Sequence, residues 1–214
     1  MTPANDPSVD YRALVRRGYD TCAQAYDSSR RTEPGTELEA LSSRLQEEDS
    51  VLDIGCGAGV PIARSLARRH RVTGVDLSPE MVRRARRNVA GARFMCDDVM
   101  SVALPSASFD AAVAFYTVFH LPRDLHAELF HRVHRWLRPR GLFLCTLSAY
   151  SEDGYTEDDF FGVTMYWSNH GIHEYRELLT GIGFSLLHVT TTGHGYQEGE
   201  QPPERHPLVL ARKD

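Results

Sequence analysis

Lysine is almost absent from the sequence: Lys213 is the only one among 24 basic residues, so arginine supplies nearly all the positive charge. Cysteine is also scarce. The four cysteines are far apart and form no CxxC pair, which argues against a disulfide framework or a zinc ribbon and favours a reducing, cytoplasmic location. No run of eighteen apolar residues occurs, and residues 1–17 offer no apolar stretch for a secretory signal. The sequence therefore predicts neither a membrane span nor export.

Charge is modest and of both signs. The chain has 214 residues, 42% of them hydrophobic and 25% charged, with a net charge of −5, which is typical of one globular core and excludes general disorder. A mildly acidic chain has no global attraction to nucleic acid or anionic lipid, so we expect neither as a partner. The arginine clusters at 68–71 and 83–87 are interpreted as solvated helix faces. The oligomeric state stays open, a homodimer included.

Short β-branched and apolar runs alternate with segments of helical spacing. Alternation of this kind predicts βαβ units, and hence an α/β, Rossmann-like, seven-stranded and mainly parallel sheet with helices on both faces. Only a Gly- and Pro-rich loop separates the last two runs, so the C-terminal strand should pair antiparallel in a hairpin. The expected strands are Ser50–Ile54, Arg71–Asp76, Ala92–Cys96, Asp110–Phe115, Leu142–Leu147, Phe184–Thr190 and His206–Arg212.

Each of the first three strands ends in residues suited to a ligand. The first runs into Gly55-Cys56-Gly57-Ala58-Gly59, whose glycines permit a tight turn and close approach to the backbone amides. The second ends at Asp76, 23 residues after Asp53, where a carboxylate can accept from a ribose diol. The third ends in Asp97-Asp98. The structural alternatives are a plain strand-to-helix turn for the glycines, helix capping for Asp76 and solvent exposure for Asp97 and Asp98. Taken together, these features favour a nucleoside ligand.

The glycine loop also bears on which nucleoside is bound. A dinucleotide loop has G-x-G-x-x-G, whereas this sequence has G-x-G-x-G followed by Val60 and Pro61. The pattern suits an amino-acid moiety lying across the loop better than a diphosphate. A P-loop signature is absent.

Five segments follow one another along the chain: VLDIGCGAGVPIARSLA, VTGVDLSPEMV, FMCDDV, SFDAAVAF and WLRPRGLFL. In this order they resemble the successive motifs of class I S-adenosylmethionine-dependent methyltransferases of the small bacterial, methyltransferase-domain type. The resemblance covers about residues 50–148. It departs from the usual pattern at Pro139-Arg140-Gly141, where Pro-Gly-Gly is common, and at Cys96, where glycine is common.

The resemblance implies S-adenosylmethionine as the cofactor and a role for each matching position. Gly55, Gly57 and Gly59 would line its methionine portion, with Asp53 beneath the amino group and the Phe115 carbonyl near it. Asp76 would bind the ribose, Leu77 would lie beside adenine, Asp97 would take the adenine amine and the Asp98 backbone the ring. Tyr19 and Tyr26 are similar to an N-terminal segment that closes over the cofactor. We therefore expect one domain, 1–214: a helical lid without strands (1–45), a cofactor-binding half (46–148) and a substrate-side insertion with the C-terminal hairpin (149–214).

Methyl transfer from a sulfonium needs an aligned nucleophile in a dry, mostly apolar pocket, where aromatic faces can offset the cation. His120 follows the fourth strand and is a candidate general base, and Tyr116 a candidate catalytic aromatic; burial in the core is the alternative for both. Tyr166, Trp167 and His170 are expected to contact the substrate. No metal site is expected, because His131 and His134 have no third ligand nearby in sequence.

Three functions compete. The first is transfer of a methyl group to an O or N atom of a small molecule; AFYTVFHLP stands where DNA-amino methyltransferases carry Asn- or Asp-Pro-Pro-Tyr/Phe, which disfavours a DNA base. The second is a cofactor-binding protein that transfers no methyl group, as a partner subunit or with another reaction in the same pocket. The third is a nicotinamide oxidoreductase, disfavoured by the missing loop glycine.

Overall fold

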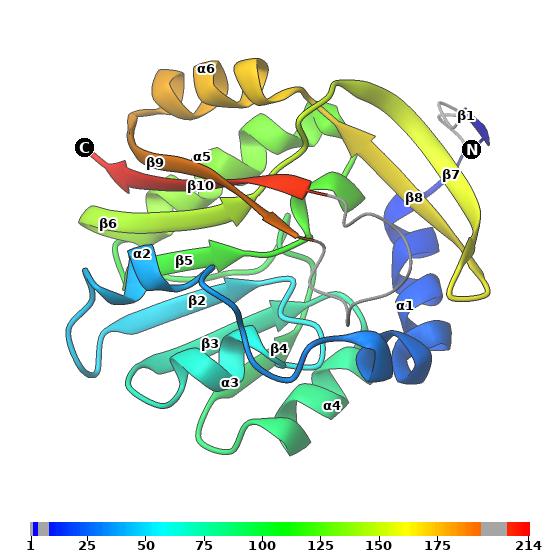
Figure 1. Cartoon of the computed structure of the whole chain (residues 1–214), viewed down its shortest axis with the longest axis horizontal. Helices are drawn as coiled ribbons and strands as arrows, with labels where there is room; N and C mark the ends of the chain where they lie inside the picture. Colours follow the sequence, from blue (N-terminus) through cyan, green and yellow to red (C-terminus); the bar gives the residue numbers. More distant parts are fainter. Residues whose placement is uncertain (1, 4–8, 194–204) are drawn as a thin grey trace.

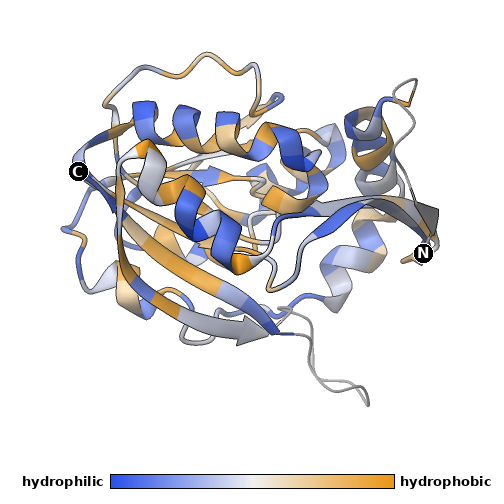
Figure 2. Cartoon of the chain, turned by 90° about the horizontal axis from the view of Figure 1, so that it is seen from above, coloured by the Kyte–Doolittle hydropathy of each residue, from blue (hydrophilic) through white to orange (hydrophobic). Residues whose placement is uncertain are grey.

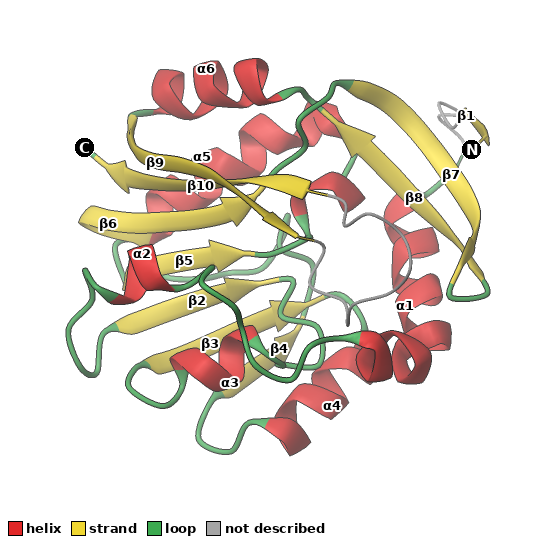
Figure 3. Cartoon of the chain, in the orientation of Figure 1, coloured by secondary structure: helices red, strands yellow, loops and turns green. Residues whose placement is uncertain are grey.

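The computed structural model describes residues 2–3, 9–193 and 205–214. Figure 3 shows helices on the faces and at one end of a central sheet. Within the described residues, no helix is both long and apolar enough to cross a membrane. The helices are α1 (Tyr11–Ser29), α2 (Glu39–Ser42), α3 (Ile62–Leu66), α4 (Pro79–Asn88), η1 (Val118–His120), η2 (Arg123–Leu125), α5 (His126–Trp136) and α6 (Ile172–Ile182); the strands are β1 (Thr2–Pro3), β2 (Ser50–Ile54), β3 (Arg71–Asp76), β4 (Arg93–Cys96), β5 (Phe109–Ala114), β6 (Leu137–Thr146), β7 (Glu152–Phe160), β8 (Val163–Asn169), β9 (Phe184–Gly193) and β10 (Arg205–Lys213).

The central sheet has seven strands in the order β4-β3-β2-β5-β6-β10-β9. The neighbours from β4 to β6 pair in parallel, and β10 pairs antiparallel with both β6 and β9. The predicted fold class is confirmed, including the antiparallel C-terminal strand. Because β2 and β5 lie side by side and the chain proceeds from them in opposite directions, the order reverses between them, which is where open parallel sheets bind ligands.

Helices cover both faces of this sheet, because successive residues of a buried strand point to opposite sides. Leu52 and Ile54 of β2 pack with α5 and α6, whereas Val51 packs with α2, α3 and α4 on the other face. Figure 2 shows the result, with hydrophobic residues concentrated along the strands and hydrophilic ones on the outer faces of the helices. Ser78 caps the N-terminus of α4: its hydroxyl accepts from the amide of Met81 at 3.1 Å.

A second, three-stranded sheet of order β1-β7-β8 was not expected from the sequence. The expectation that residues 1–45 contain no strand is wrong, because Thr2–Pro3 pairs with β7. The hairpin β7–β8 packs on α1, where the rings of Tyr11 and Tyr166 stack with centroids 4.3 Å apart. The strand expected at Leu142–Leu147 begins earlier: α5 ends at Trp136, β6 starts at Leu137, and Arg140 adopts a left-handed φ of 65° inside it.

Helix α1 lies at the carboxyl ends of the parallel strands, toward which the arrows of β2, β3 and β5 point in Figure 1. Two contacts fasten it to α4. The Ser78 hydroxyl donates to Asp20 at 2.6 Å, and Arg84 pairs with Asp27 at 3.2 Å. The hairpin β7–β8 flanks α1 on its other side. The strand tips are therefore enclosed between the sheet, α1 and the hairpin.

Candidate active site

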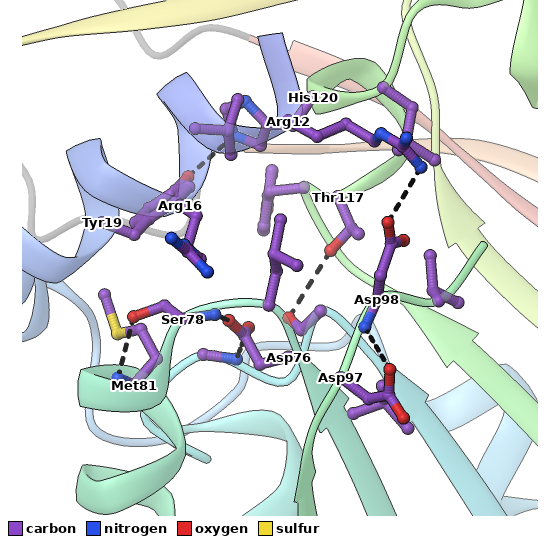
Figure 4. A pocket seen from close by; sticks show the side chains of 18 of the residues that line it. Arg12, Arg16, Tyr19, Asp76, Ser78, Met81, Asp97, Asp98, Thr117 and His120 are labelled. Carbon is purple, nitrogen blue, oxygen red and sulfur yellow. Dashed lines mark hydrogen bonds and ion pairs between the residues drawn. The ribbon is translucent and has the colours of Figure 1, made fainter. Parts of the chain in front are cut away.

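The tips of four parallel strands and one face of α1 line a single cavity of about 770 Å³, its open mouth included. Gly55 and Gly57 follow β2, Asp76 and Leu77 end β3, Asp97 and Asp98 follow β4, and Phe115 and Thr117 follow β5; α1 contributes Arg12, Val15, Arg16 and Tyr19. Figure 4 shows Arg12, Arg16 and Tyr19 of α1 across the hollow from Asp76, Asp97 and Asp98 at the strand ends.

The glycines of the loop after β2 do different things. A Cβ on Gly55, whose φ is +65°, would lie 2.1 Å from the Thr117 hydroxyl oxygen, so only glycine fits there. A Cβ on Gly57, at φ +51°, would meet nothing within 4 Å, and Gly57 lines the cavity, so the absent side chain leaves room for a ligand. Gly59 does not line this cavity. A Cβ on Gly59 would lie 2.9 Å from the Val89 side chain, so glycine there allows the loop to pack closely against α4.

Asp76 is held by backbone amides at the end of β3. Its two carboxylate oxygens accept from the amides of Gly57 and Ser78 at 2.8 and 2.9 Å. Burial raises the pKa of Asp76 to about 6, against the lowering effect of these two amides. A carboxylate fixed in this way keeps lone pairs for hydroxyl donors in the cavity, and Leu77 stands beside it in the wall.

Asp97 and Asp98 lie together at the end of β4. The amide of Asp98 donates to one oxygen of the Asp97 carboxylate at 2.8 Å, and Asp97 lines the cavity. The Asp98 carboxylate accepts from Arg12 of α1 and from the amide of Met100, both at 2.8 Å. These two acids and Leu77 thus form one wall, with an acceptor and an amide donor side by side.

A second hollow of about 430 Å³ adjoins the cavity along the glycine loop; the two share Tyr26, Gly55, Gly57 and Phe115 as walls. Asp53 is buried there, and within the described part of the chain its Oδ2 has no hydrogen-bond partner. Burial, helped by the negative charge of Asp76, raises the pKa of Asp53 to about 8. Arg30 is buried in the same hollow, its guanidinium carbon 4.8 Å from the centre of the Tyr116 ring and 5.5 Å from that of Tyr26. The hollow therefore presents a cation on one side and an unsatisfied acid on the other.

His120 and Tyr19 both line the cavity and are hydrogen-bonded to each other. The Nδ1 of His120 lies 3.0 Å from the Tyr166 carbonyl oxygen, which can only accept, so Nδ1 carries the proton. The unprotonated Nε2 then accepts from the Tyr19 hydroxyl at 2.7 Å. Burial lowers the pKa of His120 to about 4, so the imidazole is neutral at pH 7.

The other expected aromatic residues lie around this pair. Tyr116 lines the cavity, but its hydroxyl donates to the Gly193 carbonyl, and burial raises its pKa to about 12. Trp167 packs on His120 with ring centres 4.3 Å apart, and Tyr166 supplies the carbonyl that holds His120. Neither Tyr166 nor Trp167 is among the residues that line the cavity. They stand behind His120 and fix its position.

The structure does not bring His170 to the cavity. Its Nε2 donates to the Arg123 carbonyl at 3.0 Å, and its ring packs edge-on against His126. His170 lines a separate surface hollow between α5 and α6, together with His131. No group of three or more His, Cys, Asp or Glu side chains suited to a metal ion lies together in residues 2–3, 9–193 and 205–214.

Three arginines in the cavity walls were not expected from the sequence. Arg12 and Arg16 share the face of α1 that carries Tyr19, and Arg30 follows the end of that helix. The spacing 12, 16 and 19 is that of one helical face, so extending the argument for Tyr19 backwards by one and two turns would have found the first two. Nothing local in the sequence places Arg30 beside Asp53.

Comparisons with known proteins agree with this geometry. Residues 51–141 match the methyltransferase domain family. The chain is 34% identical over 152 residues to the malonyl-[acyl-carrier protein] O-methyltransferase of Serratia marcescens, covering 70% of this chain and 58% of that protein. It is 27% identical over 146 residues to the phosphoethanolamine N-methyltransferase of Plasmodium falciparum, covering 65% and 55%. The chain belongs to the class I S-adenosylmethionine-dependent methyltransferases.

Among solved structures, the chain is similar to 1,6-didemethyltoxoflavin-N1-methyltransferase of Burkholderia thailandensis, crystallised with 1,6-didemethyltoxoflavin and S-adenosylhomocysteine bound. The TM-score is 0.73, with 99% of this chain and 93% of that chain covered, at 22% sequence identity, which shows a shared fold. The chain spans little more than half the length of the two curated relatives above.

The cofactor of this methyltransferase family is S-adenosylmethionine, and the residues present fit its chemical groups. The orphaned Oδ2 of Asp53 matches an ammonium, the buried Arg30 matches a carboxylate, and the open space at Gly57 admits a chain lying across the loop. Asp76 and the pair Asp97–Asp98 present acceptors and an amide where a ribose and an adenine edge would need them.

Proposed function

We propose that this methyltransferase transfers the methyl group of S-adenosylmethionine to an O or N atom of a small molecule by in-line displacement. One observation carries the proposal above the others. The cavity and the adjoining hollow together extend from the buried acid and the glycine loop to the neutral His120 and the Tyr19 hydroxyl. Such a cavity can hold a cofactor along the strand tips and an acceptor beyond its reactive carbon.

The chain's own residues divide the cofactor site between them. Asp53 and Arg30 hold the amino and carboxylate groups of the methionine portion, and Gly55 and Gly57 let it lie against the loop. Asp76 binds the ribose hydroxyls, and Leu77, Asp97 and the Asp98 amide surround the adenine. The hydrogen bond between the Asp98 amide and the Asp97 carboxylate would then be replaced by hydrogen bonds from each of these groups to the adenine. When bound, the cofactor supplies an electrophilic methyl group on a sulfonium.

The pair of Tyr19 and His120 is placed to manage the acceptor's proton. The imidazole is held in one tautomer by the Tyr166 carbonyl, so its Nε2 lone pair points at the Tyr19 hydroxyl. An acceptor hydroxyl or ammonium can give its proton to the Tyr19 oxygen while Tyr19 passes its own to Nε2. Burial opposes a charged imidazole, but methyl transfer removes the sulfonium charge from the same enclosed space, so the total charge there does not rise.

A small acceptor fits the surroundings of this pair. Helix α1 and the hairpin β7–β8 enclose it, with the rings of Tyr19, Tyr26 and Phe160 in mutual contact at centroid distances of 5.2 to 5.9 Å. Such walls exclude water and leave room for a compact, flat or apolar molecule rather than a folded polymer. One relative is named as an O-methyltransferase and the other as an N-methyltransferase, so either acceptor atom is compatible with the family.

The test is transfer of a trideuteriomethyl group from labelled S-adenosylmethionine into a metabolite extract, read by mass spectrometry. We expect one class of small molecule to gain a CD3 group with the wild-type chain and with Asp159→Asn, an exposed surface control, but not with Asp76→Ala. If the chain binds S-adenosylhomocysteine but labels nothing in extracts of varied origin, methyl transfer is refuted and a cofactor-binding role without transfer takes its place.

A further inference from the structure

Two guanidinium groups on α1 enter the cavity beside Tyr19, and among the described residues only Arg12 has an acidic partner. Arg12 pairs with Asp98 at 2.8 Å through one nitrogen, while 41% of its side chain stays exposed. Arg16 lines the same cavity, and among the described residues no carboxylate, carbonyl or hydroxyl bonds its side chain. Figure 4 shows Arg16 pointing from α1 into the hollow, toward the side where Asp76 and Ser78 lie.

The acids of the cavity are engaged elsewhere. Asp76 and Asp97 each accept from backbone amides, and Asp98 already holds Arg12 and the Met100 amide. An arginine that lines a ligand cavity without an acidic partner keeps all five N–H donors for a ligand. Planar guanidinium matches carboxylate and phosphate oxygens in a two-point geometry, and the two arginines are one helical turn apart on one face.

We infer that Arg16, assisted by Arg12, recognises an anionic group, a carboxylate or a phosphate, on the methyl acceptor. This inference rests on the proposed function and adds the charge of its substrate. The anion would sit at the cavity mouth under α1, while the acceptor atom reaches the Tyr19–His120 end. The positive charge of a sulfonium bound nearby also favours an anionic acceptor.

Arg17 is the matched control. It is the next residue of the same helix, carries the same charge, is exposed, and does not line the cavity. Arg16→Gln and Arg17→Gln therefore change the net charge of α1 equally, and only the first removes a guanidinium from the cavity.

The experiment measures binding to the chain saturated with S-adenosylhomocysteine, using isothermal titration calorimetry. The probes are 4-hydroxybenzoate, 4-hydroxyphenyl phosphate and the neutral 4-hydroxybenzamide. We expect one or both anionic probes to bind at least about tenfold more tightly than the neutral amide. Comparing the affinities of the two anionic probes shows whether the site recognises a carboxylate or a phosphate. Arg16→Gln should remove that advantage, a loss of about tenfold, while Arg17→Gln keeps it.

Three results overturn the inference, and each is distinct from failure of the proposed function. Equal binding of anionic and neutral probes, or equal loss in both variants, leaves Arg16 with no role in anion recognition. A loss of S-adenosylhomocysteine affinity in Arg16→Gln would assign the guanidinium to the adenosine instead. If the wild-type chain does not bind S-adenosylhomocysteine at all, the proposed function itself fails.

Discussion

Replacing Asp53 by Asn tests the electrostatics of the methionine end of the cavity. Asp53 is buried with its pKa raised to about 8 from an ordinary 3.8, so the folded chain holds a proton there that the unfolded chain has lost. Whenever the folded state binds more protons, the free energy of unfolding falls as the pH rises, by up to about 1.4 kcal/mol per pH unit for one proton. The fall should run from pH 3.8 to 8 and stop above it.

Other groups mask part of that range. The pKa of His120 and of His126 is lowered to about 4, so these two residues make the free energy of unfolding rise with pH up to about 6.5. The pKa of Asp76 is raised to about 6, so Asp76 makes the free energy of unfolding fall with pH up to about that value. Between pH 6.5 and 8, Asp53 acts alone among these four. We therefore expect the ligand-free chain to lose about 2 kcal/mol of stability over that interval.

Asn has the shape of a protonated Asp and no charge to bury. Asp53→Asn should therefore be as stable as the wild type at pH 6.5 and about 2 kcal/mol more stable at pH 8, while Asp159→Asn, which removes an exposed acid, should keep the fall. Urea unfolding at the two pH values measures this. A wild-type chain with no fall, or an Asp53→Asn chain that retains it, would refute the reasoning.

The other predictions concern ligand binding and turnover. Asp76→Ala should weaken S-adenosylhomocysteine binding by roughly 1.5–3 kcal/mol, since two charged hydrogen bonds are lost; unchanged affinity by calorimetry would take Asp76 out of the site. Gly57→Ala puts a methyl group in the cavity and should cost more than tenfold in that affinity but only about 1–2 kcal/mol in urea unfolding. His120→Ala and Tyr19→Phe should each lower turnover far more than cofactor affinity, and wild-type turnover of either would return the pair to packing.

The central sheet was predictable because its strands are buried on both faces. Runs such as AAVA and LFLC are apolar along their whole length and buried, and acids and glycines gather near the strand ends, where the fold brings ligand groups together. The hairpin β7–β8 gave no such signal. Glu152–Phe160 is rich in Asp and Glu, which are depleted from strands, and it is held in extended form by β8 and α1 rather than by its own preferences.

Within the site, the contacts that sequence reasoning could not supply are those between distant segments. Tyr19 and His120 are 101 positions apart, and their bond depends on how α1 crosses the strand tips. His170 was expected to contact the substrate, but the chain turns after β8 and carries it to the side of α5. Gly59 belongs to the loop pattern, yet the left-handed turn directs it at α4.

The most direct test is a crystal structure of the chain with S-adenosylhomocysteine. We expect the ribose hydroxyls within hydrogen-bonding distance of the Asp76 carboxylate, the methionine amine beside Asp53, and the sulfur facing the Tyr19–His120 end of the cavity. A nucleoside found anywhere other than these strand tips, or a sulfur turned away from Tyr19 and His120, would contradict the account.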